Sequence, residues 1–110
     1  MYEQGEIVVV PFPFSDLSDR KQRPVLVLSK HLYNLKSDDI ITCAMTSNIK
    51  QVKHSIMINN RNLQAGSIPR DSMIKVDKLF SLEKSMIKKR IGKVNPETFE
   101  KIRDEFVSLV

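Results

Sequence analysis

The apolar residues of this chain fall into short runs rich in β-branched side chains, separated by turn-forming and charged residues. The longest run, residues 7–14 (IVVVPFPF), contains two prolines and is far shorter than the roughly 20 residues that a membrane-spanning helix needs. Runs of this length are typical of strands. The expected strands cover 6–14, 24–29, 38–47, 55–59, 72–76 with 78–82 (two short strands or one bent one), and part of 86–94, with loops at 15–22 and 59–71.

The end of the chain carries the clearest helix signal. Asn95 is a favourable N-cap, and Pro96 suits the first helical position. Glu97 and Glu100 favour the positive end of the helix dipole. Apolar residues then recur at helical spacing, which predicts a helix that closes a core: Phe99, Ile102, Phe106 and Leu109.

Five or more short strands followed by one helix predict a mainly β fold with a C-terminal helix, in which a small antiparallel sheet curves strongly or closes into a barrel. No linker or repeat divides the 110 residues, so we expect a single domain over 1–110. The strands at 7–10 and 25–28 are apolar on both faces. Either a second copy of the chain, in a homodimer, or the terminal helix must cover the outer face.

Charge is unevenly distributed along the sequence. The chain has a net charge of +5, but residues 50–93 carry eleven basic and three acidic side chains. The segments before and after are slightly acidic. A basic middle favours a surface for a polyanion such as a nucleic acid, although a well-solvated lysine-rich surface is the alternative.

The single cysteine, Cys43, excludes a disulfide within the chain and fits a reducing compartment. The first residues, MYEQGE, lack the basic and apolar regions of a secretory signal, so we expect a cytoplasmic protein.

Several kinds of catalytic chemistry lack their motifs here. Two histidines and one cysteine, without HExxH or CxxC, make a metal site unexpected, and neither GxxxxGK[ST] nor GxGxxG is present for a nucleotide cofactor. There is also no GxSxG nucleophile elbow. We therefore expect no metal and no cofactor, with any chemistry performed by ordinary side chains on a basic surface.

Two polar positions stand at strand ends. Arg23 precedes Pro24, which biases its backbone toward an extended conformation, and its guanidinium can donate two parallel hydrogen bonds to a phosphate. Alternation along the third strand places Cys43 with the core-facing residues and Thr46 on the opposite face, where its hydroxyl can bind a phosphate. The alternatives are an ordinary surface arginine and a threonine that simply suits a strand.

In order along the chain, GEIVVVPF, KQRPVLVLS, IITCAMTSN, DSMIKVDKLFSLEK and RIGKV before a terminal helix resemble the MazF/PemK (Kid) toxins. The resemblance implies a dimeric SH3-like barrel of the CcdB/PemK type. It also implies the toxin of a type II toxin–antitoxin system, a metal-independent, sequence-selective endoribonuclease of single-stranded RNA. Its implied partners are a cognate antitoxin, a second copy of the chain, and operator DNA through the antitoxin complex only.

The resemblance also implies site residues. Arg23, Thr46 and Asp77 are implied as catalytic, with His54 as a weaker candidate for the base. The chain departs from the family pattern in two places: Lys75 stands where arginine is more frequent, and loop 15–22 lacks a glycine-rich stretch. The residues implied in RNA binding are Ser18, Asp19, Gln22, Ser47, Asn48, Lys50 and Lys75.

In the implied mechanism, the RNA 2′-hydroxyl attacks the neighbouring phosphorus and leaves a 2′,3′-cyclic phosphate and a 5′-hydroxyl. Two other functions stay open: a non-catalytic gyrase poison with the same barrel, and a plain nucleic-acid-binding barrel. A gyrase poison of the CcdB type would present aromatic residues on the surface of its terminal helix. A plain binding barrel would explain the basic middle but not Arg23.

Overall fold

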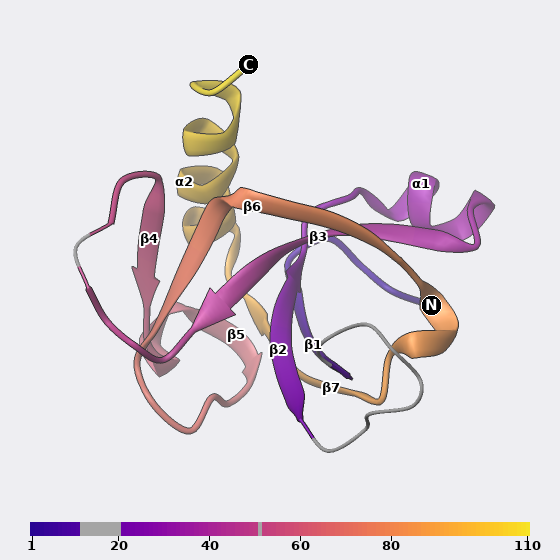
Figure 1. Cartoon of the computed structure of the whole chain (residues 1–110), viewed down its shortest axis with the longest axis horizontal. Helices are drawn as coiled ribbons and strands as arrows, with labels where there is room; N and C mark the ends of the chain where they lie inside the picture. The colour runs from indigo at the N-terminus through magenta and orange to yellow at the C-terminus, as the bar shows by residue number, and fades with distance from the viewer. Residues whose placement is uncertain (12–20, 51) are drawn as a thin grey trace.

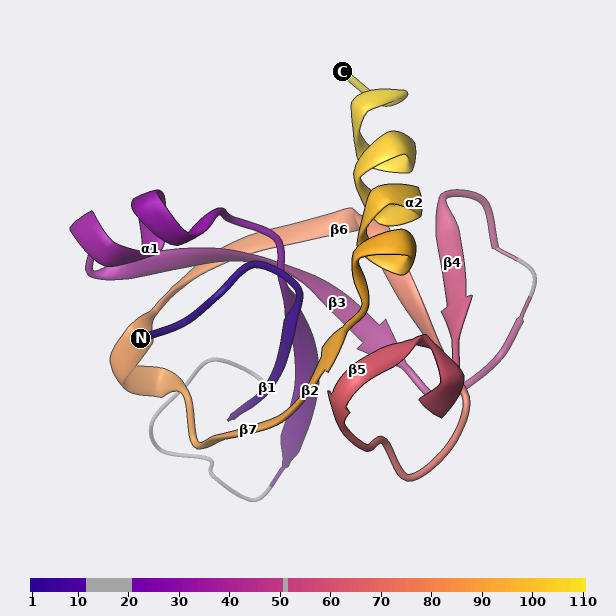
Figure 2. The same cartoon turned by 180° about the vertical axis from the view of Figure 1, so that it is seen from behind.

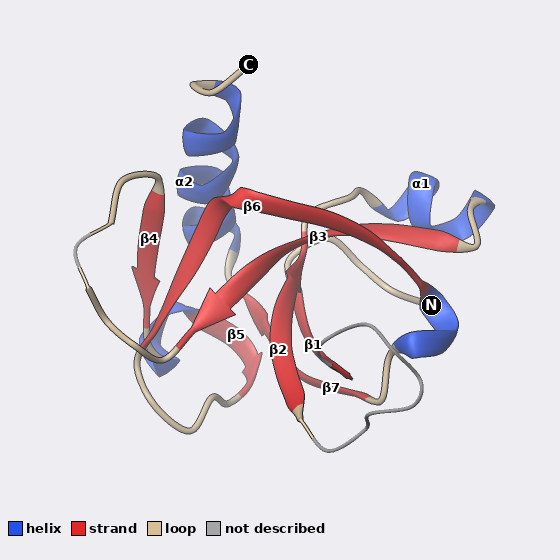
Figure 3. Cartoon of the chain, in the orientation of Figure 1, coloured by secondary structure: helices blue, strands red, loops and turns tan. Residues whose placement is uncertain are grey.

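The computed structural model describes residues 1–11, 21–50 and 52–110 (Figures 1 and 3). The strands in these ranges are β1 (Glu6–Pro11), β2 (Gln22–Val27), β3 (Asp39–Thr46), β4 (Ser55–Ile58), β5 (Leu63–Gly66), β6 (Ser72–Glu83) and β7 (Lys89–Val94). The helices are α1 (His31–Lys36) and α2 (Pro96–Val107), with short 3₁₀ turns η1 (Asn60–Asn62) and η2 (Lys84–Met86).

All of these strands belong to one antiparallel sheet in the order β4-β6-β3-β2-β1-β7-β5. The sheet curls into a half-barrel, and α2 stands against one end of it (Figures 1 and 2). The predicted class, mainly β with a C-terminal helix in a small curved sheet, is confirmed.

Apolar clusters lie on both faces of the central strands. Ile7 and Leu26 belong to one cluster, which Ile102 of α2 helps to cover. Val8 and Val25 belong to the other, which is covered by buried residues of β3 and β6 and by partly buried ones that include Tyr2, Phe80, Met86 and Ile87. One chain thus covers both faces, so the two-sided apolar strands do not by themselves require a second copy.

Helix α2 forms as the capping signal predicts. The side-chain oxygen of Asn95 accepts a hydrogen bond from the backbone N–H of Thr98 at 2.8 Å, and Pro96 begins the helix. Ile102 is fully buried, and Phe99 and Phe106 pack against the same core. Leu109 lies beyond the end of the helix and is exposed, so the predicted stripe is one residue too long. No described helix is long and apolar enough to cross a membrane.

Two elements, α1 and β5, were not expected from the sequence. The hydrophobic pattern does not predict helix α1, because its apolar side chains Leu32 and Leu35 are exposed and its polar side chain Asn34 is buried. The Asn34 amide donates to the carbonyls of Ser29 at 2.9 Å and Tyr2 at 3.1 Å, so tertiary hydrogen bonds hold this turn in place.

The bounds of three strands can be compared with expectation. Residues Ser72–Glu83 form one strand, β6, which is one of the two expected alternatives, and its pairing with β3 shifts register between Cys43 and Ala44. Strand β2 begins two residues earlier than predicted, at Gln22. Strand β1 is described to Pro11, and the rest of the expected strand, 12–14, lies outside the described residues.

Candidate functional site

Arg23 and Thr46 are brought together by the pairing of β2 with β3. Val25 lies opposite Ala44 in this antiparallel ladder, and continuing the same register by two residues places Arg23 opposite Thr46. On its other side Arg23 pairs with Val10 of β1, so its backbone lies inside the sheet rather than at the mouth of a strand. Both side chains line the same hollows, at the end of β3 and the beginning of β2.

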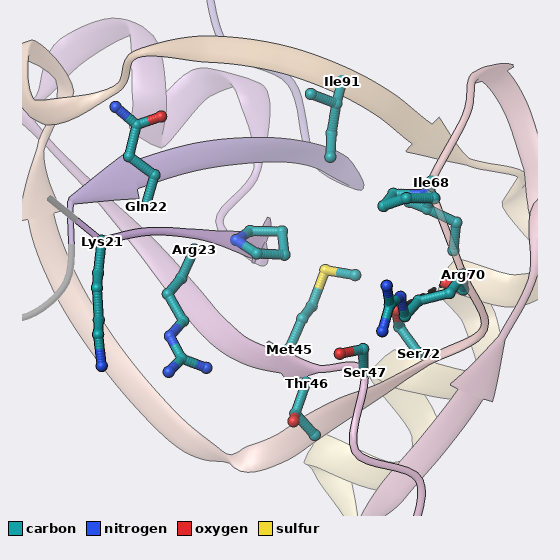
Figure 4. A pocket seen from close by; sticks show the side chains of 12 residues that line it. Lys21, Gln22, Arg23, Met45, Thr46, Ser47, Ile68, Arg70, Ser72 and Ile91 are labelled. Atoms are coloured by element: carbon teal, nitrogen blue, oxygen red, sulfur yellow. Dashed lines mark hydrogen bonds between the residues drawn. The ribbon is translucent and has the colours of Figure 1, made fainter.

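The larger hollow has a volume of about 440 Å³, and we call it the arginine hollow. In Figure 4, Arg23 projects from one side and Arg70 from the other, with Met45, Thr46 and Ser47 between them. The described residues that line it are Lys21, Gln22, Arg23, Pro24, Met45, Thr46, Ser47, Ile68, Pro69, Arg70, Ser72 and Ile91.

The second hollow, of about 380 Å³, adjoins the first through Arg23, Pro24, Met45 and Thr46, and we call it the lysine hollow. Strand β6 forms its far side and contributes Lys75, Lys78 and Phe80. Among the described residues, the two hollows are lined by five basic side chains and by no carboxylate. A concave surface of one sign concentrates a ligand of the opposite sign, so these two hollows suit a polyanion.

Hydroxyl groups accompany the cations. The Oγ1 atom of Thr46 accepts a hydrogen bond from the backbone N–H of Asn48 at 3.1 Å, which leaves the hydroxyl proton of Thr46 able to donate to a ligand. Ser47 and Ser72 also line the arginine hollow, and Ser72 donates to the carbonyl oxygen of Arg70 at 3.0 Å. The site can therefore offer both charged and neutral donors to phosphate oxygens.

The structure gathers some of the predicted residues and separates others. Gln22 and Ser47 line the arginine hollow, and Lys75 lines the lysine hollow. Asn48 supports Thr46, whereas Lys50 lines a different hollow beside β4. Two further predicted residues, Ser18 and Asp19, lie outside the described residues.

Asp77 does not line the site, although Lys75 and Lys78 on either side of it line the lysine hollow. It belongs to residues 76–78 of β6, which have no partner in β3 because of the register shift, and its side chain is exposed. It lines neither the arginine hollow nor the lysine hollow.

His54, the weaker candidate for the base, also lies away from both hollows. Its Nδ1 atom is 2.8 Å from Oε2 of Glu105 on α2, and its φ of +64° is unusual for a residue with a side chain. Cys43 is fully buried, as expected for a core residue, and burial raises the pKa of its thiol to about 12.

The sequence prediction missed Lys21, Arg70, Ser72 and Lys78. Lys21, Ser72 and Lys78 lie in segments that carry the family resemblance, but the resemblance assigned roles only to their neighbours. Arg70 lies in the turn-rich connection before β6, where the general excess of basic residues was the only available signal. Arg70 is 47 positions from Arg23 in the chain and reaches the same hollow only because the β5–β6 connection folds back toward β2 and β3.

Comparison with known proteins now adds to this geometry. The family model of the PemK-like, MazF-like toxin of type II toxin–antitoxin systems matches residues 3–110. No curated protein gives a significant match.

Solved structures share the fold at low sequence identity. An endoribonuclease in complex with its cognate antitoxin, from a mycobacterial species, has a TM-score of 0.76 and 17% identity, covering 98% of this chain and 93% of its own. The Mycobacterium tuberculosis toxin MazF-mt6 has a TM-score of 0.75 and 13% identity, with coverage of 94% and 93%. A MazE–MazF complex from Deinococcus radiodurans has a TM-score of 0.75 and 21% identity, with coverage of 98% and 94%.

Proposed function

Because the chain belongs to the PemK-like, MazF-like family of type II toxin–antitoxin toxins, we propose that it is a metal-independent endoribonuclease that cleaves single-stranded mRNA at selected sequences. The observation that carries this proposal is that Arg23 and Thr46 line both of two adjoining hollows, whose described lining has five cations and no carboxylate. This arrangement suits a phosphodiester whose negative charge increases during the reaction.

RNA supplies the nucleophile for this reaction. The 2′-hydroxyl oxygen attacks the neighbouring phosphorus, the bond from phosphorus to the 5′ oxygen breaks, and the products carry a 2′,3′-cyclic phosphate and a 5′-hydroxyl. The Arg23 guanidinium stabilises the added charge on the phosphorus oxygens, and the Thr46 hydroxyl donates a hydrogen bond to one of them. A base takes the proton of the 2′-hydroxyl, and an acid returns a proton to the 5′ oxygen.

Asp77 remains our proposed base, although it lines neither hollow. For Asp77 to act, bound RNA must pass across the lysine hollow to the segment 76–78 of β6, which has no partner in β3. Replacing Asp77 with asparagine keeps the shape of the side chain and removes the base. We expect this variant to bind RNA normally and to lose turnover, whereas normal turnover would transfer the role to another group.

The decisive experiment incubates the purified protein with a long RNA in EDTA and identifies the termini of the products. Arg23→Ala should lower the cleavage rate about 10²–10³-fold, as for loss of one transition-state donor. Thr46→Val should lower it roughly 10–100-fold, as for loss of one hydrogen bond to a charged group. The matched control is Arg103→Ala, which removes an exposed arginine of α2.

Specific outcomes contradict the proposal. A DNA strand of the same sequence lacks the 2′-hydroxyl and must resist cleavage. The assignment of the site is wrong if Arg23→Ala and Thr46→Val fold and cut RNA at the normal rate. Products with 3′-hydroxyl ends would exclude attack by the 2′-hydroxyl.

We also propose a cognate antitoxin, a homodimer, and contact with operator DNA only through the antitoxin complex, all in the cytoplasm. Complexes with an antitoxin are present among the solved structures that share the fold. Since one chain covers both faces of β1 and β2, dimerisation must use another surface. Sedimentation at micromolar concentration tests this, and a monomer under those conditions would exclude the dimer.

The gyrase-poison alternative gains no support from α2. The two aromatic side chains of this helix, Phe99 and Phe106, pack against the core rather than forming an aromatic patch on its surface. Trapping of gyrase on DNA, with long RNA left intact, would nevertheless favour that alternative.

A further inference from the structure

Part of the arginine hollow is not used by the proposed cleavage chemistry. Beyond Arg23 and Thr46, its lining continues onto Ile68 and Arg70 of the β5–β6 connection and onto Ile91 of β7 (Figure 4). We propose that this part is a subsite for the nucleotide next to the cleaved bond, where Arg70 binds that nucleotide's phosphate and an apolar wall holds its base. The inference rests on the proposed ribonuclease function.

Arg70 is suited to hold an anion. Its side chain is exposed and forms no hydrogen bond or ion pair with the described residues. The adjacent carboxylate, Asp71, does not line the hollow, whereas the hydroxyl-bearing Ser47 and Ser72 do. Because the Ser72 hydroxyl already donates to the Arg70 carbonyl oxygen, the donors available to a phosphate are the Arg70 guanidinium and the Ser47 hydroxyl, which together can satisfy several of its oxygens.

The connection that carries Arg70 is held in place by its own hydrogen bonds. The backbone N–H of Ile68 donates to Oδ1 of Asn60 at 2.8 Å, and the Asn60 amide donates to the Ile68 carbonyl at 3.2 Å. The N–H of Ser67 donates to the carbonyl of Ile91 at 3.0 Å, which ties the connection to β7. Arg70 therefore projects from an ordered support, which lowers the entropic cost of binding.

One wall of the arginine hollow is apolar. Ile68 is buried, Ile91 is half-buried, and Met45 and Pro24 complete the surface. Single-stranded RNA is recognised mainly through splayed bases that stack on or insert against protein side chains. At about 440 Å³, the hollow lies within the range typical of small-ligand sites, so one nucleotide is a reasonable occupant.

Connectivity favours RNA over an acidic protein segment. If Arg23 and Thr46 hold the scissile phosphate, the next phosphate of the same strand must lie one nucleotide away. Arg70 is the basic group on the opposite side of the same hollow. A nucleotide joins one base to one phosphate, which matches an apolar wall followed by a cation.

The test begins by mapping the cleavage site on long RNA. A labelled oligonucleotide spanning that site, made uncleavable by one 2′-deoxy sugar, is then titrated with wild type, Arg70→Ala and the control Arg103→Ala. We expect Arg70→Ala to bind about tenfold more weakly, with the salt slope of log K reduced by about 0.7, as for loss of one phosphate contact. Arg103→Ala should match wild type in both quantities.

Chemical substitution of the RNA identifies the phosphate. Methylphosphonate, which removes the charge, replaces each flanking phosphate in turn. At one position adjacent to the cleaved bond, the substitution should weaken RNA binding by the wild-type protein about tenfold. It should not change RNA binding by Arg70→Ala, because this variant already lacks the contact between Arg70 and that phosphate. An abasic nucleotide at that position should also weaken wild type, and an unchanged affinity would refute the role of the apolar wall.

The outcomes separate the subsite from the proposed function. If wild type cleaves RNA but Arg70→Ala binds it equally well, the subsite is wrong and the ribonuclease stands. If every methylphosphonate affects Arg70→Ala as it affects wild type, Arg70 binds no particular phosphate and the subsite is also wrong. Poly-glutamate serves as a probe for an acidic protein segment. If Arg70→Ala weakens binding of poly-glutamate but not of RNA, the hollow binds protein and the nucleotide subsite is wrong. If wild type binds RNA and never cleaves it, the proposed function fails instead.

Discussion

Gly66 ends β5 with a φ of +73°, at the point where the chain turns toward the connection that carries Arg70. A Cβ atom at this position would lie 2.1 Å from the carbonyl oxygen of Ile91 and 2.5 Å from Cα of Gly92. Both neighbours are backbone atoms of β7, which is hydrogen-bonded to β5, so they cannot rotate away as a side chain could. Gly66→Ala is therefore expected to be strongly destabilising.

The cost of this substitution has two parts. A left-handed conformation costs a residue with a side chain about 1–2 kcal/mol. Forcing an additional carbon against fixed atoms adds roughly 1–3 kcal/mol. The sum, about 2–5 kcal/mol, is a large share of the 5–15 kcal/mol typical of small domains. For a chain of this length it corresponds to a Tm lower by roughly 8–20 °C.

Gly5→Ala is the matched control for Gly66→Ala. Gly5 has a φ of +90°, but its nearest neighbour would be Cγ2 of Val94 at 3.3 Å, a side-chain atom that can shift. Gly5→Ala should therefore show the conformational cost without the backbone overlap. Urea unfolding followed by far-UV circular dichroism measures both variants. Equal destabilisation of the two would refute the overlap between β5 and β7 as the cause.

Three further predictions concern the core and the surface. Ile102→Ala, which removes the fully buried anchor of α2, should lower the free energy of unfolding by about 2–5 kcal/mol, and a loss under 1 kcal/mol in urea unfolding would contradict that anchoring. Because burial raises the pKa of the Cys43 thiol to about 12, a disulfide reagent at pH 8 should react with the native protein only through unfolding; rapid reaction in the native state would disprove this. A hydrogen bond from Lys93 lowers the pKa of the Glu3 carboxyl. The ionised carboxylate therefore stabilises the fold at pH values above 4.5, the usual pKa of this group, and the stabilisation is lost as the pH falls through the lower pKa of the folded state. Lys93→Met should bring the Glu3 pKa back toward its usual value in an NMR titration, and an unchanged pKa would exclude Lys93 as the cause.

Local chemistry determined much of this fold in advance. The Asn95–Pro96 cap and the helical spacing around Ile102 predicted α2 because each acts within a few residues of its own position. The β-branched runs predicted most strands for the same reason. Helix α1 was missed because Asn34 is buried by hydrogen bonds to distant residues, which reverses the polarity pattern that marks a surface helix.

The candidate site, more than the helices and strands, depends on contacts between residues far apart in the sequence. The order of motifs along the chain singled out Arg23, Thr46 and Asp77, but the sequence carries no distances. Extending the antiparallel register between β2 and β3 places Arg23 opposite Thr46, and both line the two hollows. Asp77 lines neither hollow, although its neighbour Lys78 lines one of them. The approach of Arg70 to Arg23 could come only from the tertiary structure, since curling of the sheet and folding of the β5–β6 connection join segments that no local pattern relates.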